Sequence, residues 1–268
     1  MSSISILGCG WLGLALAEEI IKRGFKVKGS TTTTEKISQL QSKGIEAYEI
    51  ELPNNKFDKS FFDTDFLIID IPPKSSKAGV NHHFESIKSI IPYIKNDQKI
   101  IYISSTSVYP DVDHPINEDH ELDKNSDRAN ALIQVEQLLL NTFYDRLTII
   151  RSGGLLGYDR IPGKYFAGKK VNQYDQKVNY LHRDDAVGII ITVIDKKAWG
   201  CILNAVAPQH PTRKEVYLKN ADDYSFEYPI FENTPQELTN RIIENSKIEQ
   251  ILDYSFIYPD PLHFFYIN

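Results

Sequence analysis

Apolar and polar positions in the first 151 residues alternate between two patterns. Short runs rich in Ile and Val predict buried strands, whereas longer stretches with apolar residues three or four apart predict helices. This alternation is typical of a parallel sheet covered by helices on both faces. The predicted strands are residues 4–7, 26–29, 47–52, 66–71, 99–104 and 147–151, and the predicted helices are residues 11–23, 35–43, 81–91 and 126–143.

The pattern changes after residue 151. Residues 152–178 are rich in Gly, Tyr and Lys and predict an irregular insertion, whereas a helix at 184–194 and a strand at 201–206 return to the earlier alternation. From residue 208 onward, aromatic residues and prolines are frequent. We therefore expect a main domain of residues 1–151, to which residues 182–206 return. Residues 152–181 and 207–268 are expected to form a smaller region over the carboxyl ends of the strands, where α/β proteins bind ligands.

Composition narrows the classes of protein that the chain can belong to. Its 268 residues, 41% hydrophobic and 25% charged, have an ordinary globular balance. The net charge of −6 disfavours nucleic acid and anionic membranes as partners. No apolar run reaches the roughly 18 residues of a membrane span, and no signal peptide is recognisable at the start. The two cysteines, Cys9 and Cys201, do not form a disulfide framework, so we expect a cytoplasmic protein.

Residues 8–13, Gly-Cys-Gly-Trp-Leu-Gly, match the pattern G-x-G-x-x-G between a predicted strand and a predicted helix. In a dinucleotide-binding turn, Gly8 allows the tight turn, Gly10 lets the backbone approach the pyrophosphate, and Gly13 lets the helix pack on the strand. The N–H groups at the start of the helix then face the phosphates. The alternative interpretation is a tight turn that binds no ligand. The sequence therefore predicts a Rossmann doubly wound parallel α/β sheet with a small C-terminal substrate-binding domain.

The end of the second predicted strand bears on which dinucleotide binds. NAD enzymes place Asp or Glu there, about 20 residues after the glycines, to accept from the ribose 2′-hydroxyl. This chain has Gly-Ser followed by four threonines at 29–34, and its first carboxylate, Glu35, comes too late. Hydroxyl groups with Lys36 nearby suit a 2′-phosphate, so we predict NADP. If the threonines only cap the helix, NAD fits as well. The predicted cofactor-binding residues are Gly8, Gly10, Trp11, Leu12, Gly13, Ser30, Thr31, Thr32, Ile71, Pro72 and Ser104.

Further segments carry a resemblance to a known family. Residues 104–110, Ser-Ser-Thr-Ser-Val-Tyr-Pro, are similar to the SS-x-x-VYG segment of extended short-chain dehydrogenases/reductases, the NAD-dependent epimerase/dehydratase family, with proline in place of the glycine. Residues 151–157, 179–185, 201–205 and 258–259 resemble other segments of that family in the same order. The resemblance covers essentially the whole chain. It implies an NAD(P)-binding oxidoreductase or a nucleoside-diphosphate-sugar epimerase-like protein that acts on a small polar molecule.

The resemblance breaks at the catalytic residues. In the family, a serine or threonine polarises the substrate oxygen, and a tyrosine with a lysine four residues later moves the proton. Ser105 occupies the first position, but counting back eight and four residues from Glu136 gives Arg128 and Leu132. Residues 126–143 contain neither tyrosine nor lysine, and Leu132 is expected to pack inward. The chain is therefore similar to an atypical subgroup that lacks the Tyr-x-x-x-Lys pair.

Ser105 and Arg128 remain the candidate catalytic residues. Ser105 can bond a substrate oxygen or simply satisfy nearby backbone, and Arg128 can bind a carboxylate or phosphate or remain a solvated residue of the first helical turn. Tyr109, Tyr158 or Tyr165 could supply a replacement acid.

The carboxylates and histidines of the loop at 111–121 lack fixed ligand spacing, so no metal is predicted. Two functions remain open. One is an atypical NAD(P)-dependent enzyme, and the other is a non-catalytic NADP(H)-binding sensor or regulatory module.

Overall fold

The computed structural model describes residues 2–54, 56–73, 81–232 and 240–268. The contacts divide the chain into two compact units. Unit 1 consists of residues 1–108, 122–151 and 190–202, and unit 2 of residues 109–121, 152–189 and 203–268. In the described part of the chain, no helix is long and apolar enough to cross a membrane.

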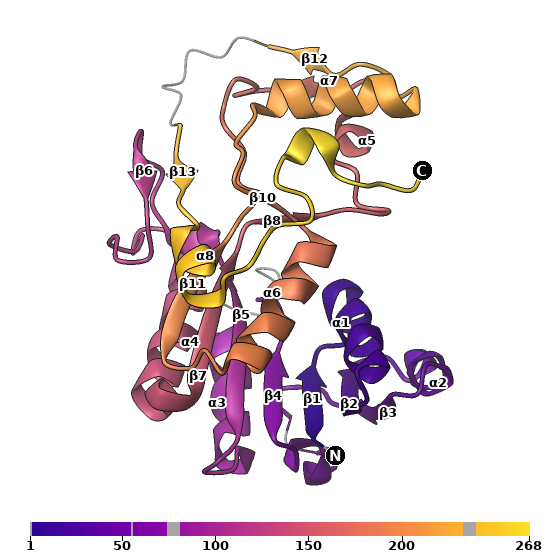
Figure 1. The fold of residues 1–268 in the computed structure, drawn as a ribbon, viewed down its shortest axis with the longest axis vertical. Coiled ribbons are helices and arrows are strands. Elements are labelled where there is room, and N and C mark those ends of the chain that lie inside the picture. Colours follow the sequence, from indigo (N-terminus) through magenta and orange to yellow (C-terminus); the bar gives the residue numbers. More distant parts are fainter. Residues whose placement is uncertain (1, 55, 74–80, 233–239) are drawn as a thin grey trace. The chain divides into compact units, whose positions relative to one another are not determined.

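A seven-stranded sheet forms the centre of the fold, in the order β11-β7-β5-β4-β1-β2-β3 (Figure 1). The pairs β1–β2, β2–β3, β1–β4 and β4–β5 are parallel. The chain winds outward from β1 in both directions, which confirms the predicted doubly wound Rossmann topology. The strands are β1 (Ser3–Leu7), β2 (Lys26–Thr31), β3 (Glu46–Glu49), β4 (Phe66–Ile69), β5 (Lys99–Ser105), β7 (Leu147–Ser152) and β11 (Cys201–Ala205).

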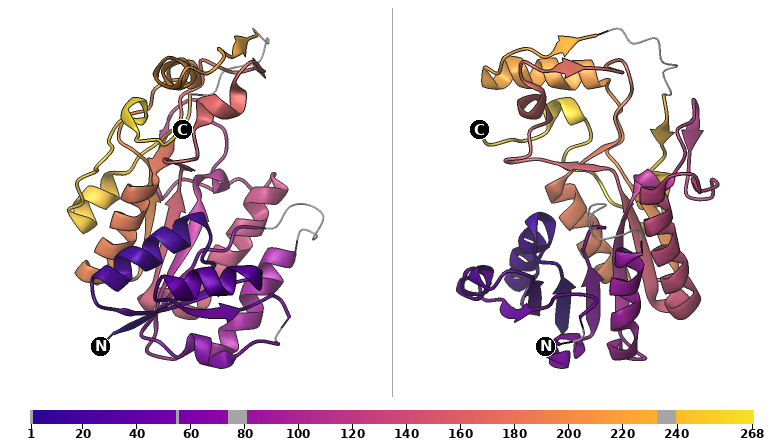
Figure 2. Two further views of the ribbon diagram at one scale, coloured as in Figure 1. Left: turned by 90° about the vertical axis from the view of Figure 1, so that its right-hand side faces the viewer. Right: turned by 180° about the vertical axis from the view of Figure 1, so that it is seen from behind.

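Helices flank this sheet where the sequence pattern placed them (Figure 2). They are α1 (Trp11–Lys22), α2 (Glu35–Ser42), α3 (His82–Ile90), α4 (Asp127–Phe143) and α6 (Arg183–Lys196). The helices α1 and α2 each end just before a glycine with positive φ, Gly24 at 84° and Gly44 at 79°, a conformation that glycine adopts without strain. The α4 helix begins after Ser126, whose hydroxyl accepts a hydrogen bond from the Ala129 N–H at 3.3 Å.

Two strands are shorter than predicted, because their partners end first. β4 ends at Ile69 rather than at residue 71, since β1 turns away at Gly8 after Leu7 has accepted the Asp70 N–H at 2.9 Å. β3 ends at Glu49 rather than at residue 52. Its last link to β2 is the bond from the Ile50 N–H to the Thr31 carbonyl, at 2.9 Å.

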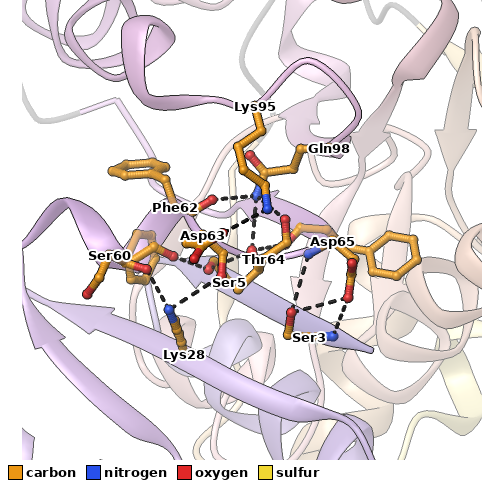
Figure 3. Close-up of polar contacts among 12 residues, drawn as sticks. Ser3, Ser5, Lys28, Ser60, Phe62, Asp63, Thr64, Asp65, Lys95 and Gln98 are labelled. Carbon is orange, nitrogen blue, oxygen red and sulfur yellow. Dashed lines mark hydrogen bonds and ion pairs between the residues drawn. The ribbon is translucent and has the colours of Figure 1, made fainter. Parts of the chain in front are cut away.

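The amino ends of β1, β4 and β5 are joined by a dense polar network (Figure 3). The Gln98 side chain donates to the Phe62 carbonyl at 3.0 Å and to the Thr64 hydroxyl at 2.9 Å. The Asp65 carboxylate accepts from the Ser3 N–H at 2.7 Å. This end of the sheet is thus tied together by the protein's own groups, whereas the opposite, carboxyl end carries the glycine turn.

Unit 2 is built from short elements rather than from the irregular chain that the sequence predicted for residues 152–178. Three parallel strand pairs are present, β8–β10, β9–β12 and β6–β13. Their bounds are β6 (Pro115–Ile116), β8 (Gly154–Leu156), β9 (Lys170–Val171), β10 (Tyr180–His182), β12 (Ile230–Phe231) and β13 (Ile242–Ile243). The helices are α5 (Pro162–Phe166), α7 (Arg213–Tyr224) and α8 (Ser246–Leu252). Strands of two or three residues give too little periodicity to be recognised in a sequence.

Two local interactions stabilise unit 2. The α7 helix, which the sequence analysis missed, begins with a capping box in which Thr212 and Glu215 bond each other's backbone N–H groups. Asp185 on α6 is fully buried, and its carboxylate accepts from the Tyr254 hydroxyl at 3.0 Å and from the N–H groups of Ile257 and Tyr258 at 2.7 and 3.0 Å. These bonds fix the chain that follows α8.

Candidate functional site

The glycine turn after β1 is held in place by Ser30 near the end of β2. The Gly8 N–H donates to the Ser30 hydroxyl oxygen, and the Cys9 N–H donates to the Ser30 carbonyl, both at 2.8 Å. The α1 helix then starts at Trp11, and no side chain caps its first turn. The turn therefore presents backbone N–H groups at a helix start, an arrangement that suits an anion.

The three glycines of the turn differ in how much space a side chain would have at each position. A Cβ on Gly8 would lie 2.4 Å from the Asp70 carbonyl oxygen, and Gly8 has a φ of 107°. A Cβ on Gly13 would lie 2.3 Å from the Gly8 carbonyl oxygen. A Cβ on Gly10 would meet nothing within 4 Å. The protein's own packing thus explains Gly8 and Gly13, whereas the space beside Gly10 is open to a ligand, as a dinucleotide pyrophosphate requires.

A cavity of about 270 Å³ opens beside this turn, at the carboxyl ends of β1, β2 and β4 in unit 1. Small-molecule pockets usually have volumes of about 300–1,000 Å³, so this cavity suits one part of a dinucleotide. Among the predicted cofactor residues, it is lined by Gly8, Gly10, Ser30, Thr31, Thr32, Ile71 and Pro72. The sequence analysis did not include the other lining residues, namely Leu7, Cys9, Thr33, Lys36, Ile50, Leu52, Asp70, His82, His83 and Ser86, among the predicted cofactor residues.

Hydroxyl groups and one lysine dominate the side of the cavity that follows β2. Thr31, Thr32, Thr33 and Lys36 all line it, and the Thr31 hydroxyl accepts from the Thr33 N–H at 3.1 Å. Asp70, after β4, is the lining residue with a carboxylate. The position where NAD enzymes hold the ribose 2′-hydroxyl with an acid is therefore occupied by alcohols and a cation.

Cys9 fills space rather than offering a reactive thiol. It is 6% exposed, and a Cβ built on Gly29 would lie 2.6 Å from its sulfur. Burial, with a smaller contribution from the Asp70 carboxylate, raises the pKa of the Cys9 thiol to about 12. The thiolate, which is the reactive form, is thus scarce at neutral pH.

Four predicted cofactor residues lie outside the residues that line the cavity. Leu12 and Gly13 are buried in α1 beneath the turn, and Trp11 is half-buried at the start of that helix. Ser104 is 5% exposed, and its hydroxyl donates to the Glu136 carboxylate at 2.5 Å. Ser104 therefore interacts with the core of unit 1.

The candidate catalytic residues occupy simple local environments. The Ser105 hydroxyl accepts from the Ser107 N–H at 3.1 Å, which is the backbone-satisfying role considered above. Arg128 is exposed in the first turn of α4, and among the described residues no hydrogen bond or ion pair joins it to Ser105. The α4 helix contains neither tyrosine nor lysine, and Leu132 is 3% exposed, which confirms that it packs inward.

A buried ion pair behind the end of β5 was not predicted. The Arg151 guanidinium on β7 lies 2.7 Å from the Glu136 carboxylate on α4, and the two side chains are 3% and 1% exposed. Because Glu136 also accepts from Ser104, the pair joins β5, α4 and β7. No periodicity reveals such a pair, since a glutamate on an amphipathic helix is ordinarily expected to face solvent.

The tyrosines considered as replacement acids all belong to unit 2. The buried Tyr109 hydroxyl donates to the Asn204 side chain at 2.8 Å, and the Tyr158 hydroxyl donates to Asp184 at 3.0 Å. Tyr165 is 54% exposed. Among the described residues, no group of three or more His, Cys, Asp or Glu could hold a metal ion.

Comparison with known proteins places the chain among nucleotide-binding folds. Residues 3–121 match the family model of the NAD binding domain of 6-phosphogluconate dehydrogenase. The chain is 32% identical to Protein YeeZ of Escherichia coli (strain K12) over 269 residues, which cover 98% of each chain.

Solved structures agree on the fold. A short-chain dehydrogenase/reductase superfamily protein from Agrobacterium tumefaciens with bound NAD has a TM-score of 0.81 at 15% identity, covering 97% of this chain and 94% of that one. A putative NAD-dependent epimerase/dehydratase from Methylobacillus flagellatus has a TM-score of 0.78 at 22% identity, covering 97% and 94%. UDP-glucose 4-epimerase from Bifidobacterium longum, in complex with NAD+ and UDP, has a TM-score of 0.79 at 17% identity, covering 97% and 96%. The resemblance to extended short-chain dehydrogenases/reductases is confirmed at the level of the fold.

Proposed function

Because the chain belongs to the family of Protein YeeZ and has the fold of short-chain dehydrogenases/reductases and NAD-dependent epimerases, we propose that it binds NADP(H) and acts as an atypical oxidoreductase or epimerase-like enzyme on a small polar substrate. Neighbours of the same fold are epimerases in complex with UDP or UDP-sugars, so a nucleotide-linked sugar is the first substrate class to test. Residues 152–181 and 207–268 are proposed to contribute substrate recognition.

The observation that carries the cofactor assignment is the chemistry of the cavity beyond β2. Thr31, Thr32, Thr33 and Lys36 line this side, and among the described lining residues no carboxylate comes from β2 or α2. A 2′-phosphate gains hydrogen bonds from the alcohols and charge from the lysine. An acid in this place would repel that phosphate, so the cavity favours NADP over NAD.

In the proposed reaction, the nicotinamide supplies or accepts a hydride. The uncapped N–H groups at the start of α1 are proposed to hold the pyrophosphate, and the open space beside Gly10 leaves room for it. Ser105 is proposed to orient the substrate oxygen by donating its O–H to it, while the Ser105 oxygen accepts from the Ser107 N–H.

Direct titration tests the cofactor assignment. NADPH and NADH are added separately while tryptophan fluorescence is followed, which reports on the site because Trp11 belongs to the turn. We expect NADPH to bind more tightly. Lys36→Ala should weaken NADPH binding about 10- to 150-fold and leave NADH binding unchanged, because one charge-assisted hydrogen bond contributes about 1.5–3 kcal/mol. Lys43→Ala, just beyond the opposite end of α2, is the matched control and should change neither affinity. Equal binding of both dinucleotides by the unaltered protein would remove the NADP assignment.

A non-catalytic NADP(H)-binding sensor is the second candidate function. It is favoured by the composition of α4, whose residues include no tyrosine or lysine to act as the family's proton donor. Incubation of the protein with NADP+ or NADPH and a panel of nucleotide-linked sugars separates the two. Net oxidation or reduction would give a sustained change in nicotinamide absorbance, whereas epimerisation returns the hydride and is followed by NMR of the sugar. Either activity, lost in Gly10→Ala, supports the enzyme. Tight NADPH binding with no turnover over the panel supports the sensor.

A further inference from the structure

Two histidines at the start of α3 line the cavity, and the fold and the glycine turn give no reason for them. His82 is half-buried, whereas His83 is 3% exposed. The His83 Nε2 lies 2.9 Å from the hydroxyl of Tyr102, a fully buried residue in the middle of β5. Among the described residues, no other hydrogen bond is made by the His83 ring.

The Tyr102 hydroxyl determines how this pair is protonated. Burial raises the Tyr102 pKa well above its ordinary value, so the hydroxyl keeps its proton. His83 is its hydrogen-bond partner, and a buried O–H that donates to nothing costs about 1–3 kcal/mol. This hydroxyl is satisfied when Tyr102 donates to Nε2 and His83 accepts there.

His83 is consequently a neutral donor rather than a cation. Burial, with a smaller contribution from the neighbouring His82, lowers the His83 pKa to about 4. An imidazole that is neutral and accepts at Nε2 carries its proton on Nδ1. This N–H belongs to a buried side chain on the wall of the cavity, where it needs an acceptor.

We propose that Tyr102 holds His83 in the Nδ1–H tautomer, and that this N–H is the donor with which the cavity recognises a neutral acceptor of an adenine nucleoside, on the base or the ribose. The inference rests on the proposed dinucleotide function and assigns a recognition residue to its adenosine half. Different residues of the cavity would then recognise different parts of the ligand. Lys36 and the threonines meet the charged 2′-phosphate, whereas His83 meets an uncharged nitrogen or oxygen.

The tautomer is measured first, without any ligand, by long-range ¹H–¹⁵N correlation spectra of the imidazoles at pH 7. We expect the His83 proton on Nδ1 in the unaltered protein. In Tyr102→Phe the ring should shift toward the Nε2–H form, since the donor to Nε2 is gone. A proton on Nε2 in the unaltered protein would overturn the proposal.

Binding is measured by calorimetry with NADPH and with adenosine 2′,5′-bisphosphate, which contains only the adenosine half. His83→Phe keeps a flat ring without the donor and should weaken both ligands about 5- to 100-fold, because a buried acceptor is left unpaired. His82→Phe is the matched control on the same cavity wall and should change affinity less than about threefold. Thermal unfolding of each variant shows whether it is folded.

The outcomes separate the two proposals. If the unaltered protein binds neither probe, the proposed function fails, and this inference fails with it. If it binds both and folded His83→Phe binds them equally well, only the inference about His83 is overturned. Should His83→Phe not fold, the tautomer spectrum of the unaltered protein and the affinities of Tyr102→Phe still decide the matter, with a several-fold loss expected for the latter.

Discussion

The glycine turn after β1 and the carboxyl end of β5 lie in the same unit, yet they retain different amounts of binding chemistry. At the turn, the backbone N–H groups at the start of α1 have no side-chain cap, and the space beside Gly10 is open. At the end of β5, the Ser104 and Ser105 hydroxyls are both bonded within the protein. The first region is built to receive a ligand, whereas the second is largely satisfied by the protein itself.

This difference shows that a phosphate-binding turn and a proton relay place different demands on one fold. A phosphate site made of backbone depends on glycines and on a helix start, and few substitutions preserve it. A proton relay depends on two side chains of one helix, and it disappears when these are replaced without any effect on the strands. In α4, Leu132 faces inward and stabilises the core, and the helix contains neither tyrosine nor lysine.

The largest effect is expected at the buried pair of Glu136 and Arg151. Glu136→Ala leaves a guanidinium buried without its carboxylate and should lower the free energy of unfolding by about 3–5 kcal/mol. Arg151→Met leaves the Glu136 carboxylate buried without its guanidinium and should lower the free energy of unfolding by a similar amount. Urea denaturation measures both changes.

The double variant Glu136→Leu with Arg151→Met is the control, because it removes both charges. It should recover most of the lost stability. Single variants that lose less than about 1 kcal/mol would show that the pair is not structural. Both side chains would then become candidates for the missing chemistry, and the contrast between the two regions would weaken.

A smaller effect is expected when the pH is lowered, because protonation of His83 should reduce the free energy of unfolding by about 3 kcal/mol. The His83 pKa is about 4 in the folded protein and about 6.5 in the unfolded chain, so the unfolded state binds more protons between these values. Stability contributed by His83 is therefore complete above pH 6.5 and is lost as the pH falls to 4. Unfolding free energies measured across this window should fall more steeply for the unaltered protein than for His83→Phe.

The informative quantity is the difference between the unaltered protein and His83→Phe, rather than either pH profile of the unfolding free energy alone. The pKa values of His182 and His210 are also lowered by burial and act in the same direction, while the raised pKa of buried Asp185 acts in the opposite one. These contributions are common to both proteins and cancel in the difference. Parallel profiles would mean that His83 is protonated as easily in the fold as outside it.

The sequence predicted the fold where one rule dominated each segment. Apolar runs bounded by glycine and proline located the strands of unit 1, and glycines with positive φ ended α1 and α2. The cavity was partly predictable for the same reason, since Gly8, Gly10 and the threonines follow a spacing. Lys36 was noted beside the threonines, and the structure places it on the cavity wall.

What the sequence did not reveal depends on contacts between distant residues. His83 gains its importance from Tyr102, which is 19 positions away, and Glu136 from Arg151, which is 15 away. No local pattern distinguishes such residues from solvated ones. Unit 2 was missed for a different reason, because its strands of two or three residues leave no periodic signal.

Alanine substitutions at Gly13 and Gly10 should differ in their effect on the free energy of unfolding, with a loss of about 1–3 kcal/mol at Gly13 and almost none at Gly10. Gly13→Ala forces a Cβ against the Gly8 carbonyl and should destabilise the fold by about 1–3 kcal/mol. Gly10→Ala meets open space and should change stability by less than about 0.5 kcal/mol. It should nonetheless weaken NADPH binding more than about tenfold, because the methyl group occupies the space of the pyrophosphate.

Thermal unfolding and NADPH titration of both variants, side by side, test this separation. Each glycine serves as the control for the other, since the substitution is the same and the helix is shared. Undiminished NADPH binding by Gly10→Ala would mean that the open space beside the turn is not where the phosphates lie.

The smallest effect on stability is expected at Arg128, an exposed residue of α4 and one of the two candidate catalytic residues. Its side chain is solvated in the first turn of α4, so Arg128→Ala should change the free energy of unfolding by less than about 0.5 kcal/mol and leave NADPH affinity unchanged. Ser105→Ala removes one local hydrogen bond and should cost about 0.5–1.5 kcal/mol. Urea denaturation and titration give these values. If Arg128→Ala instead destabilises the protein by more than 1 kcal/mol, the arginine interacts with the fold in solution, and a free anion-binding role at this position is lost. If both variants behave as expected, their fold and cofactor site are intact. Any loss of turnover in them then reports a lost interaction between Arg128 or Ser105 and the substrate.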